Sequence, residues 1–194
     1  MINQIAEHIF VKNLRRRPDR LEHMQTQLAR IGANYTVLDV ADDKGTKLSA
    51  TWWNAQNGLQ IIRYAKAARL FSVLSLDDDC VFIDEFNVRL AELWPHIPSD
   101  WDMVSFGEIF GQKEEIYPGI VKSNYSWGGH ATLIKNTIYD ALLEHIRGET
   151  YADEEINLRL KSHINFYVFR PYLVTQLADF SDLKNEYVRN EKFE

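Results

Sequence analysis

Short apolar runs alternate along this chain with segments whose apolar residues recur at helical spacing. The run 10–14 precedes a segment in which Leu21, Met24, Leu28 and Ile31 recur at helical spacing. This order continues, with expected strands at 10–14, 35–40, 71–76, 80–83, 103–106, 130–134 and 166–169, and expected helices at 18–31, 52–70, 86–94, 136–146 and 153–160. We expect the segment 110–125 to be rich in turns, Asp84 to cap the helix that follows it, and the charged tail after Ser181 to be peripheral.

Strands that alternate with helices predict an α/β/α sandwich, in which helices cover both faces of a central, mostly parallel mixed sheet. No internal repeat or low-complexity linker divides the sequence. We therefore expect residues 1–194 to form a single domain.

Composition excludes several classes of protein. The chain has 194 residues, of which 45% are hydrophobic, and this is enough apolar mass for a core. A net charge of −6 argues against binding to nucleic acid, because such binding depends on clustered Lys and Arg. No apolar run approaches the roughly 18 residues of a membrane span, and residues 1–10 lack the pattern of a signal peptide. We therefore expect a cytoplasmic protein without a membrane span.

Three consecutive acids, Asp77, Asp78 and Asp79, directly follow the apolar run 71–76. Ligands of open α/β sheets bind at the carboxyl ends of strands, which is where these acids are expected. Two such charges about 4 Å apart repel by roughly 4 kcal/mol at an effective dielectric near 20, so a cation is needed beside them. Oxygen ligands favour magnesium, manganese or calcium, and this predicts a metal site. From these residues alone, a solvated turn is the alternative.

A second segment of interest combines Trp127 with Gly128 and Gly129. Glycines let backbone N–H groups approach a ligand closely, and an indole offers a flat apolar surface to a sugar. A structural turn with Trp127 in the core is the alternative interpretation.

The sequence FSVLSLDDDCVFI at 71–83 resembles the acidic motif of glycosyltransferase family 25, whose members modify lipopolysaccharide and collagen. The acidic triplet of that family is related to the Asp-x-Asp motif of GT-A enzymes, and a segment like 98–102, PSDWD, follows it. The opening segment FVKNLRRRPDRLEHMQTQL at 10–28 is also similar to the first strand and helix of the family. The compact chain further resembles a virus-encoded glycosyltransferase domain.

This resemblance implies a GT-A (Rossmann-like) fold and a hexosyltransferase that uses a UDP-sugar as donor with Mn²⁺ or Mg²⁺. It implies that Asp77 and Asp79 contact the metal and that Asp78 lies near the ribose. The C-terminal histidine that often completes the metal shell of GT-A enzymes has no counterpart here, since no histidine follows His163. The remaining residues that the resemblance places beside the nucleotide are Val11, Asn13, Arg17 and Asp39.

Inverting GT-A enzymes place an acidic base near the start of a late helix, and the segment 152–155 resembles that motif. The resemblance implies Asp153 as the base, with Glu154 as the second choice. The alternative is a capping role, because acids are favoured at any helix N-terminus. The predicted reaction transfers a sugar, with inversion, to a hydroxyl of a glycan or glycoprotein acceptor. A nucleotidyltransferase and a non-catalytic sugar-binding or nucleotide-binding module are the competing interpretations.

Overall fold

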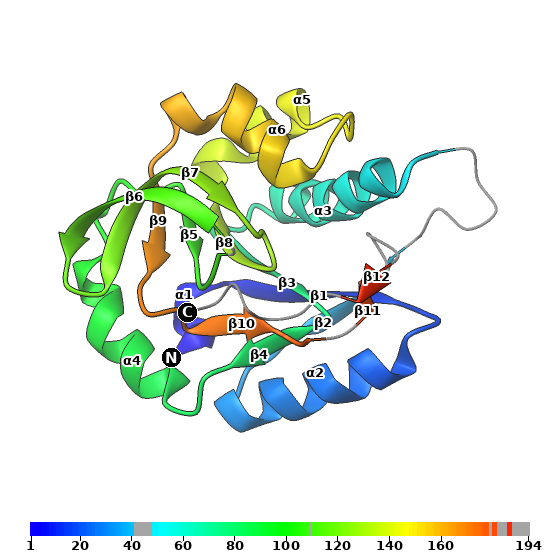
Figure 1. Cartoon of the computed structure of the whole chain (residues 1–194), viewed down its shortest axis with the longest axis horizontal. Coiled ribbons are helices and arrows are strands. Elements are labelled where there is room, and N and C mark those ends of the chain that lie inside the picture. The colour runs from blue at the N-terminus through cyan, green and yellow to red at the C-terminus, as the bar shows by residue number, and fades with distance from the viewer. Residues whose placement is uncertain (41–47, 109, 179, 182–185, 188–194) are drawn as a thin grey trace.

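The computed structural model describes residues 1–40, 48–108, 110–178, 180–181 and 186–187. Within these residues, an eight-stranded sheet has the order β2–β1–β3–β8–β5–β9–β7–β6 (Figure 1). Its strands are β1 (His8–Leu14), β2 (Thr36–Val40), β3 (Ser72–Asp77), β5 (Met103–Ser105), β6 (Phe110–Tyr117), β7 (Ile120–Trp127), β8 (Ala131–Lys135) and β9 (Phe166–Phe169). β1 pairs in parallel with β2 and β3, as β5 does with β9, whereas β7 and β8 run antiparallel to their neighbours. The predicted mixed, mostly parallel sheet is confirmed.

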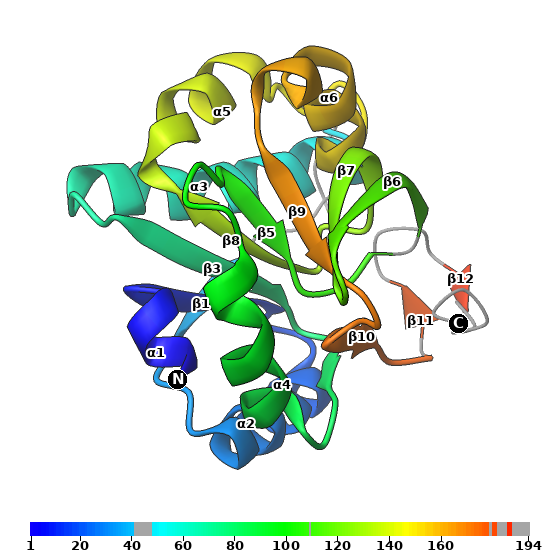
Figure 2. The same cartoon turned by 90° about the vertical axis from the view of Figure 1, so that its left-hand side faces the viewer.

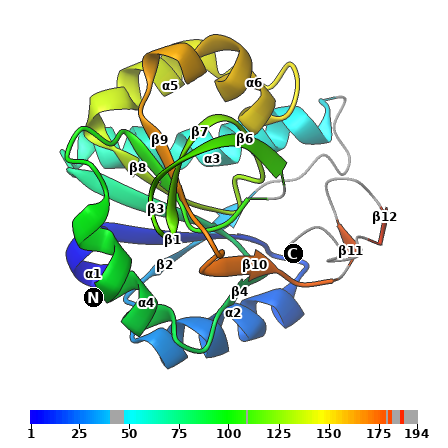
Figure 3. The same cartoon turned by 60° about the vertical axis from the view of Figure 1, so that its left-hand side comes forward.

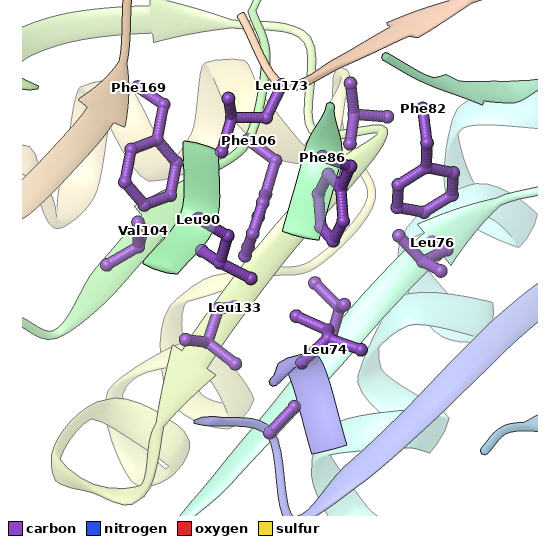
Figure 4. Close-up of a cluster of buried hydrophobic side chains, with 14 of the residues drawn as sticks. Leu74, Leu76, Phe82, Phe86, Leu90, Val104, Phe106, Leu133, Phe169 and Leu173 are labelled. Atoms are coloured by element: carbon purple, nitrogen blue, oxygen red, sulfur yellow. The ribbon is translucent and has the colours of Figure 1, made fainter. Parts of the chain in front are cut away.

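Helices cover both faces of this sheet (Figure 2). One face carries α1 (Ile2–Ile5), α2 (Pro18–Ile31) and α4 (Phe86–Leu93), and the other carries α3 (Ala50–Ala67), α5 (Tyr139–His145) and α6 (Ala152–Arg159). Each face buries its own apolar core, and Figure 4 shows Phe86 and Leu90 of α4 against Leu74 and Leu76 of β3. The α/β/α sandwich is therefore as predicted.

The prediction that 110–125 is rich in turns is wrong, because β6 and β7 form an antiparallel hairpin there. Its turn contains Gly119, whose φ of 92° is accessible to glycine, and a Cβ at this position would lie 2.8 Å from Leu93. β6 is the edge strand of the sheet and exposes charged residues, including Glu114 and Glu115. Charges are typical of edge strands, and here they hide the strand pattern.

A small second sheet lies beside the carboxyl end of β3 (Figure 3), where β10 (Val174–Gln176) pairs with β4 (Cys80–Phe82). Asp84, beyond β4, does not cap α4, since no side chain caps that helix and Asp84 instead pairs with Arg30.

The tail after Ser181 lies outside the described residues, apart from the short strand β12 (Glu186–Tyr187), which pairs with β11 (Phe180–Ser181). No helix in the described part of the chain combines the length and apolarity needed to cross a membrane.

A buried ionic cluster lies at the base of the hairpin. Glu108, which is fully buried, pairs with Lys113 Nζ and accepts a hydrogen bond of 2.8 Å from the Ser126 hydroxyl. Lys161 is also buried, and its Nζ lies 3.6 Å from the centroid of the Phe166 ring and has no hydrogen-bond partner among the described residues. Burial lowers the pKa of the Lys161 amine to about 7, although Glu108 acts to raise it.

We expect Lys161→Met to stabilise the protein by about 2 kcal/mol at pH 7, because it removes a charge that burial disfavours. The folded pKa lies below the unfolded one, so the wild type gains stability as pH rises from about 7 towards 10. The variant should lose this dependence, which urea unfolding at several pH values measures. Lys113→Met is the matched control and should destabilise, because it leaves Glu108 unpaired. A variant no more stable than wild type would contradict the prediction.

Candidate active site

The three acids lie where β3 ends, on the turn that leads into β4. Figure 1 shows this end of β3 beside the carboxyl end of β1, at the right of the view, where the chain turns into α2. The Asp77 N–H donates to the His130 carbonyl at 2.7 Å, and the Leu177 N–H donates to the Asp79 carbonyl at 2.8 Å. The fold therefore brings the acidic turn together with the glycine segment before β8 and with the end of β10.

Asp77 pairs with Lys12 of β1, with 2.6 Å between Asp77 Oδ1 and Lys12 Nζ. The two residues are also partners in the register of the parallel strands. Burial acts to lower the pKa of the Lys12 amine, but Asp77 more than offsets it, and the net pKa is raised. Lys12 therefore supplies one positive charge to the acidic turn.

Asp78 is the most deeply buried of the three acids, with 6% of its surface exposed. Its Oδ2 accepts a hydrogen bond of 2.9 Å from Asn13 Nδ2, and its Oδ1 lies 2.9 Å from Arg20 Nη1. Burial raises the pKa of this carboxyl, and Arg20 opposes that effect. Asn13 lies near the end of β1 and is itself buried, so Asp78 links that strand end to the acidic turn.

Asp79 receives two contacts from distant parts of the chain. Gln176 Nε2 of β10 donates to Asp79 Oδ1 at 3.1 Å, and Arg20 Nη1 lies 3.5 Å from Asp79 Oδ2. Burial, together with the neighbouring Asp77, raises the pKa of the Asp79 carboxyl to about 6. Neither Gln176 nor the role of Arg20 as a partner of these acids is predicted from the sequence.

The chemistry of these donors fits a hard divalent cation. Three carboxylates face two cations, Lys12 and Arg20, which leaves one negative charge unbalanced. Among the described residues, no group of three or more His, Cys, Asp and Glu side chains forms a metal centre. A cation at Asp77 and Asp79 would therefore take its other ligands from water and from a bound diphosphate, as is usual for magnesium sites.

The other residues expected beside the nucleotide fall into two groups. Asn13 and Asp39 are partners in the register of β1 and β2, and Asp39 accepts a hydrogen bond of 2.7 Å from Arg15 Nε. Arg17 precedes α2, and its side chain pairs with Asp19 at 2.8 Å, while its carbonyl accepts a hydrogen bond from Asn13. Val11 is different, because it has no exposed surface and packs in the core, and its place beside the base stays a prediction.

The glycine segment leaves the end of β7 and contacts α6. The Gly128 N–H donates to Asp153 Oδ2 at 2.9 Å, and Gly128 has a φ of 103° that favours glycine. Trp127 is partly buried, with its ring centroid 6.3 Å from that of Tyr151, the residue that precedes α6. Gly129 is exposed, and a Cβ there would meet nothing within 4 Å, so the backbone is open on this side.

Asp153 and the two acids after it have different surroundings. Burial raises the pKa of the Asp153 carboxyl, hydrogen bonds from Gly128 and Glu154 N–H groups oppose this, and the charge of Asp77 adds to it. Glu154 accepts a hydrogen bond from the Thr150 hydroxyl. Glu155 is fully buried and accepts hydrogen bonds from the N–H groups of residues 147, 148 and 149, so it organises the loop before α6. Of these three acids, Asp153 is the one that bonds the glycine segment beside the acidic turn.

Solved structures share this architecture, and two of them show the likeness. One is a glycosyltransferase involved in the glycosylation of the major capsid of PBCV-1, with a TM-score of 0.61, 11% sequence identity, and coverage of 92% of this chain and 95% of that chain. The other is a mutant of Drosophila β-1,4-galactosyltransferase 7 in complex with manganese, UDP-Gal and xylobiose, with a TM-score of 0.57, 13% identity, and coverage of 95% of this chain and 77% of that chain.

No protein-family model matches the chain, and no curated protein matches it by sequence. The structural likeness establishes the fold, which is the GT-A, Rossmann-like fold of glycosyltransferases. Membership of glycosyltransferase family 25 stays a prediction.

Proposed function

We propose that this chain is a metal-dependent glycosyltransferase that moves a hexose from a UDP-sugar to a hydroxyl of a glycan or glycoprotein acceptor, with inversion. The observation that carries the proposal is the convergence of three features at one edge of the sheet. These are the acidic turn after β3, Asn13 near the end of β1, and Asp153, which bonds Gly128 in the same glycine segment whose His130 carbonyl bonds the Asp77 N–H. A GT-A fold provides such an edge for a nucleotide sugar.

In this proposal, Asp77 and Asp79 hold Mn²⁺ or Mg²⁺, and Asp78 with Asn13 borders the ribose. Bound there, the cation neutralises charge that develops on the departing nucleoside diphosphate. Arg17, which precedes α2, and Asp39, near the end of β2, line the nucleotide side of the site. Trp127, Gly128 and Gly129 border the sugar, where the exposed backbone at Gly129 permits close approach.

Asp153 is the general base in this scheme. It takes the proton from the acceptor hydroxyl as the hydroxyl oxygen forms a bond to the anomeric carbon. The bond from that carbon to the diphosphate oxygen breaks on the opposite face, and the electron pair leaves with the diphosphate. Attack opposite the leaving group inverts the configuration. The raised pKa of Asp153 makes its carboxylate a stronger base than an ordinary aspartate.

Calorimetric titration of UDP, GDP and CMP, with and without manganese, tests the proposal. The galactosyltransferase that shares the fold was crystallised with manganese and UDP-Gal, which makes UDP the first ligand to use. We expect UDP to bind in a manganese-dependent manner, and Asp79→Ala to remove the manganese-dependent part, because Asp79 is a proposed ligand. Asp84→Ala is the matched control, since this nearby aspartate is exposed and pairs with Arg30.

Each other outcome identifies an alternative. No nucleotide binding under any condition would overturn the proposal and favour a non-catalytic module. Equal manganese dependence in Asp79→Ala and wild type would overturn the metal assignment alone. Manganese-dependent binding followed by release of pyrophosphate from a nucleoside triphosphate and a sugar phosphate would identify a nucleotidyltransferase instead.

A further inference from the structure

On one of its two edges, β7 is paired with a neighbouring strand over only the first part of its length. β6 pairs with β7 along its length, whereas β9 pairs only with Ile120, Val121 and Lys122 on the other side. At Ser126, the backbone is instead bonded by a side chain of α6. The Ser126 N–H donates to Asn157 Oδ1 at 3.1 Å, and Asn157 Nδ2 donates to the Ser126 carbonyl at 2.8 Å. Asn157 therefore bonds both backbone groups of Ser126, as a neighbouring strand would.

Asp153 lies one helical turn before Asn157, so the two side chains project from the same face of α6. Asp153 accepts the hydrogen bond from Gly128, two residues after Ser126. α6 thus contacts the end of β7 at two successive points, and its first turn carries the proposed base. Because two points of contact fix the rotation of a helix relative to a strand, loss of one leaves the other free to shift.

The Ser126 side chain adds a third restraint through a different part of the residue. Its hydroxyl donates to Glu108 Oε2 at 2.8 Å, and Glu108 is fully buried and paired with Lys113. Ser126 is therefore held through both its backbone and its side chain, and Asn157 links this fixed residue to α6. The assignment of the Asn157 amide is unambiguous, because the Ser126 N–H needs an acceptor and the Ser126 carbonyl needs a donor.

We propose that Asn157 is a positioning residue that sets the placement of Asp153 against the Gly128 N–H. The catalytic consequence rests on the proposed function, whereas the placement itself does not. A side chain that only stabilised the fold would lower the melting temperature without a specific effect at Asp153. A positioning residue changes the environment of one carboxylate.

The first test uses NMR of the wild type and of Asn157→Ala. We expect hydrogen exchange of the Gly128 amide to become at least about tenfold faster, because its bond to Asp153 is weakened. We expect the pKa of the Asp153 carboxyl, followed by its ¹³C shift, to rise as the Gly128 N–H stops stabilising the carboxylate. Asn87→Ala is the matched control, because Asn87 Nδ2 donates to the Ile31 carbonyl at 3.1 Å on the other face of the sheet. The control should change neither signal.

The second test is a double-mutant cycle with Asp153→Asn, measured as manganese-dependent UDP release from UDP-glucose and UDP-galactose. Asn157→Ala should lower turnover roughly 10-fold to 100-fold in the wild type, as expected for a misplaced catalytic group. In the Asp153→Asn background it should change turnover less than about twofold, because residues that act as a unit are not additive. If Asn157→Ala does not fold, the same measurements are made on Asn157→Ser, which keeps a polar side chain.

The outcomes separate this inference from the proposed function. Unchanged Gly128 exchange and an unchanged Asp153 pKa in a folded Asn157 variant would overturn the positioning role, even if Asp153→Asn is inactive. Full activity of Asp153→Asn would overturn the base assignment, and the NMR result would still decide the positioning role. Additive losses in the double variant would show that Asn157 acts independently of Asp153 and would overturn the inference.

Discussion

The substitution Asp153→Asn is expected to lower turnover roughly 100-fold to 10,000-fold, the usual contribution of a general base. The asparagine keeps an oxygen that can accept the hydrogen bond from the Gly128 N–H, so the loop geometry should persist. Binding of UDP with manganese should therefore change less than about twofold, because the substitution removes an interaction of the transition state and not of the ground state. UDP release from UDP-glucose and UDP-galactose, with and without added monosaccharide acceptors, measures the turnover.

Glu154→Gln is the control for this prediction. Glu154 is the neighbouring acid, and its carboxylate is already engaged by the Thr150 hydroxyl. Near-normal turnover in both variants would show that the base lies elsewhere, and a loss confined to Glu154→Gln would move the role to Glu154. The pH profile adds a second readout. Because burial raises the pKa of Asp153 and the base must be ionised, the acidic limb of kcat/KM should lie above the ordinary aspartate value of about 3.8.

The layers of the fold can be predicted from the sequence, because β3 and α2 each carry the hydrophobic pattern of their own type of element. β3 is buried from Ser72 to Leu76 and carries only small or apolar residues there, as expected for a strand covered on both faces. α2 begins at Pro18 and ends before Gly32, whose φ of 68° suits glycine, so both boundaries are readable. The hairpin of β6 and β7 cannot be predicted in this way. β6 is an edge strand whose exposed residues are charged, so its sequence lacks the apolar run that marks a buried strand.

The acids of the site are also readable, because three consecutive aspartates directly follow an apolar strand, at the end where α/β sheets bind ligands. Their partners are not, since Lys12, Arg20 and Gln176 lie far from residues 77–79 in sequence and meet them only in the folded chain. One signal does point to Arg20. It lies four residues before Met24 and eight before Leu28, on the buried stripe of α2, where an arginine requires a buried partner.

Arg20→Met is expected to destabilise the protein by about 3 kcal/mol at pH 7. Arg20 is 7% exposed, and its Nη1 contacts Asp78 at 2.9 Å and Asp79 at 3.5 Å. Methionine fills much of the space but leaves the buried Asp78 and the partly buried Asp79 without their guanidinium, and breaking a buried pair from one side typically costs about 3–5 kcal/mol. Urea unfolding in the presence of EDTA measures the change. Arg89→Met is the control, because Arg89 pairs with Glu92 at the surface and should cost no more than about 1 kcal/mol.

The pH dependence of this loss separates charge from packing. The folded pKa of Asp79 is about 6 and that of Asp78 is raised, and removal of Arg20 raises both further, since the guanidinium favours the ionised forms. A carboxyl whose folded pKa lies above its unfolded pKa costs stability once pH exceeds the unfolded value, and the cost is complete above the folded value. The difference between Arg20→Met and wild type should therefore be largest near pH 7 and shrink towards pH 4, where the carboxyls protonate. A loss that is equal at both pH values would mean that Arg20 acts through packing, and that the acidic turn tolerates its own charge without this arginine.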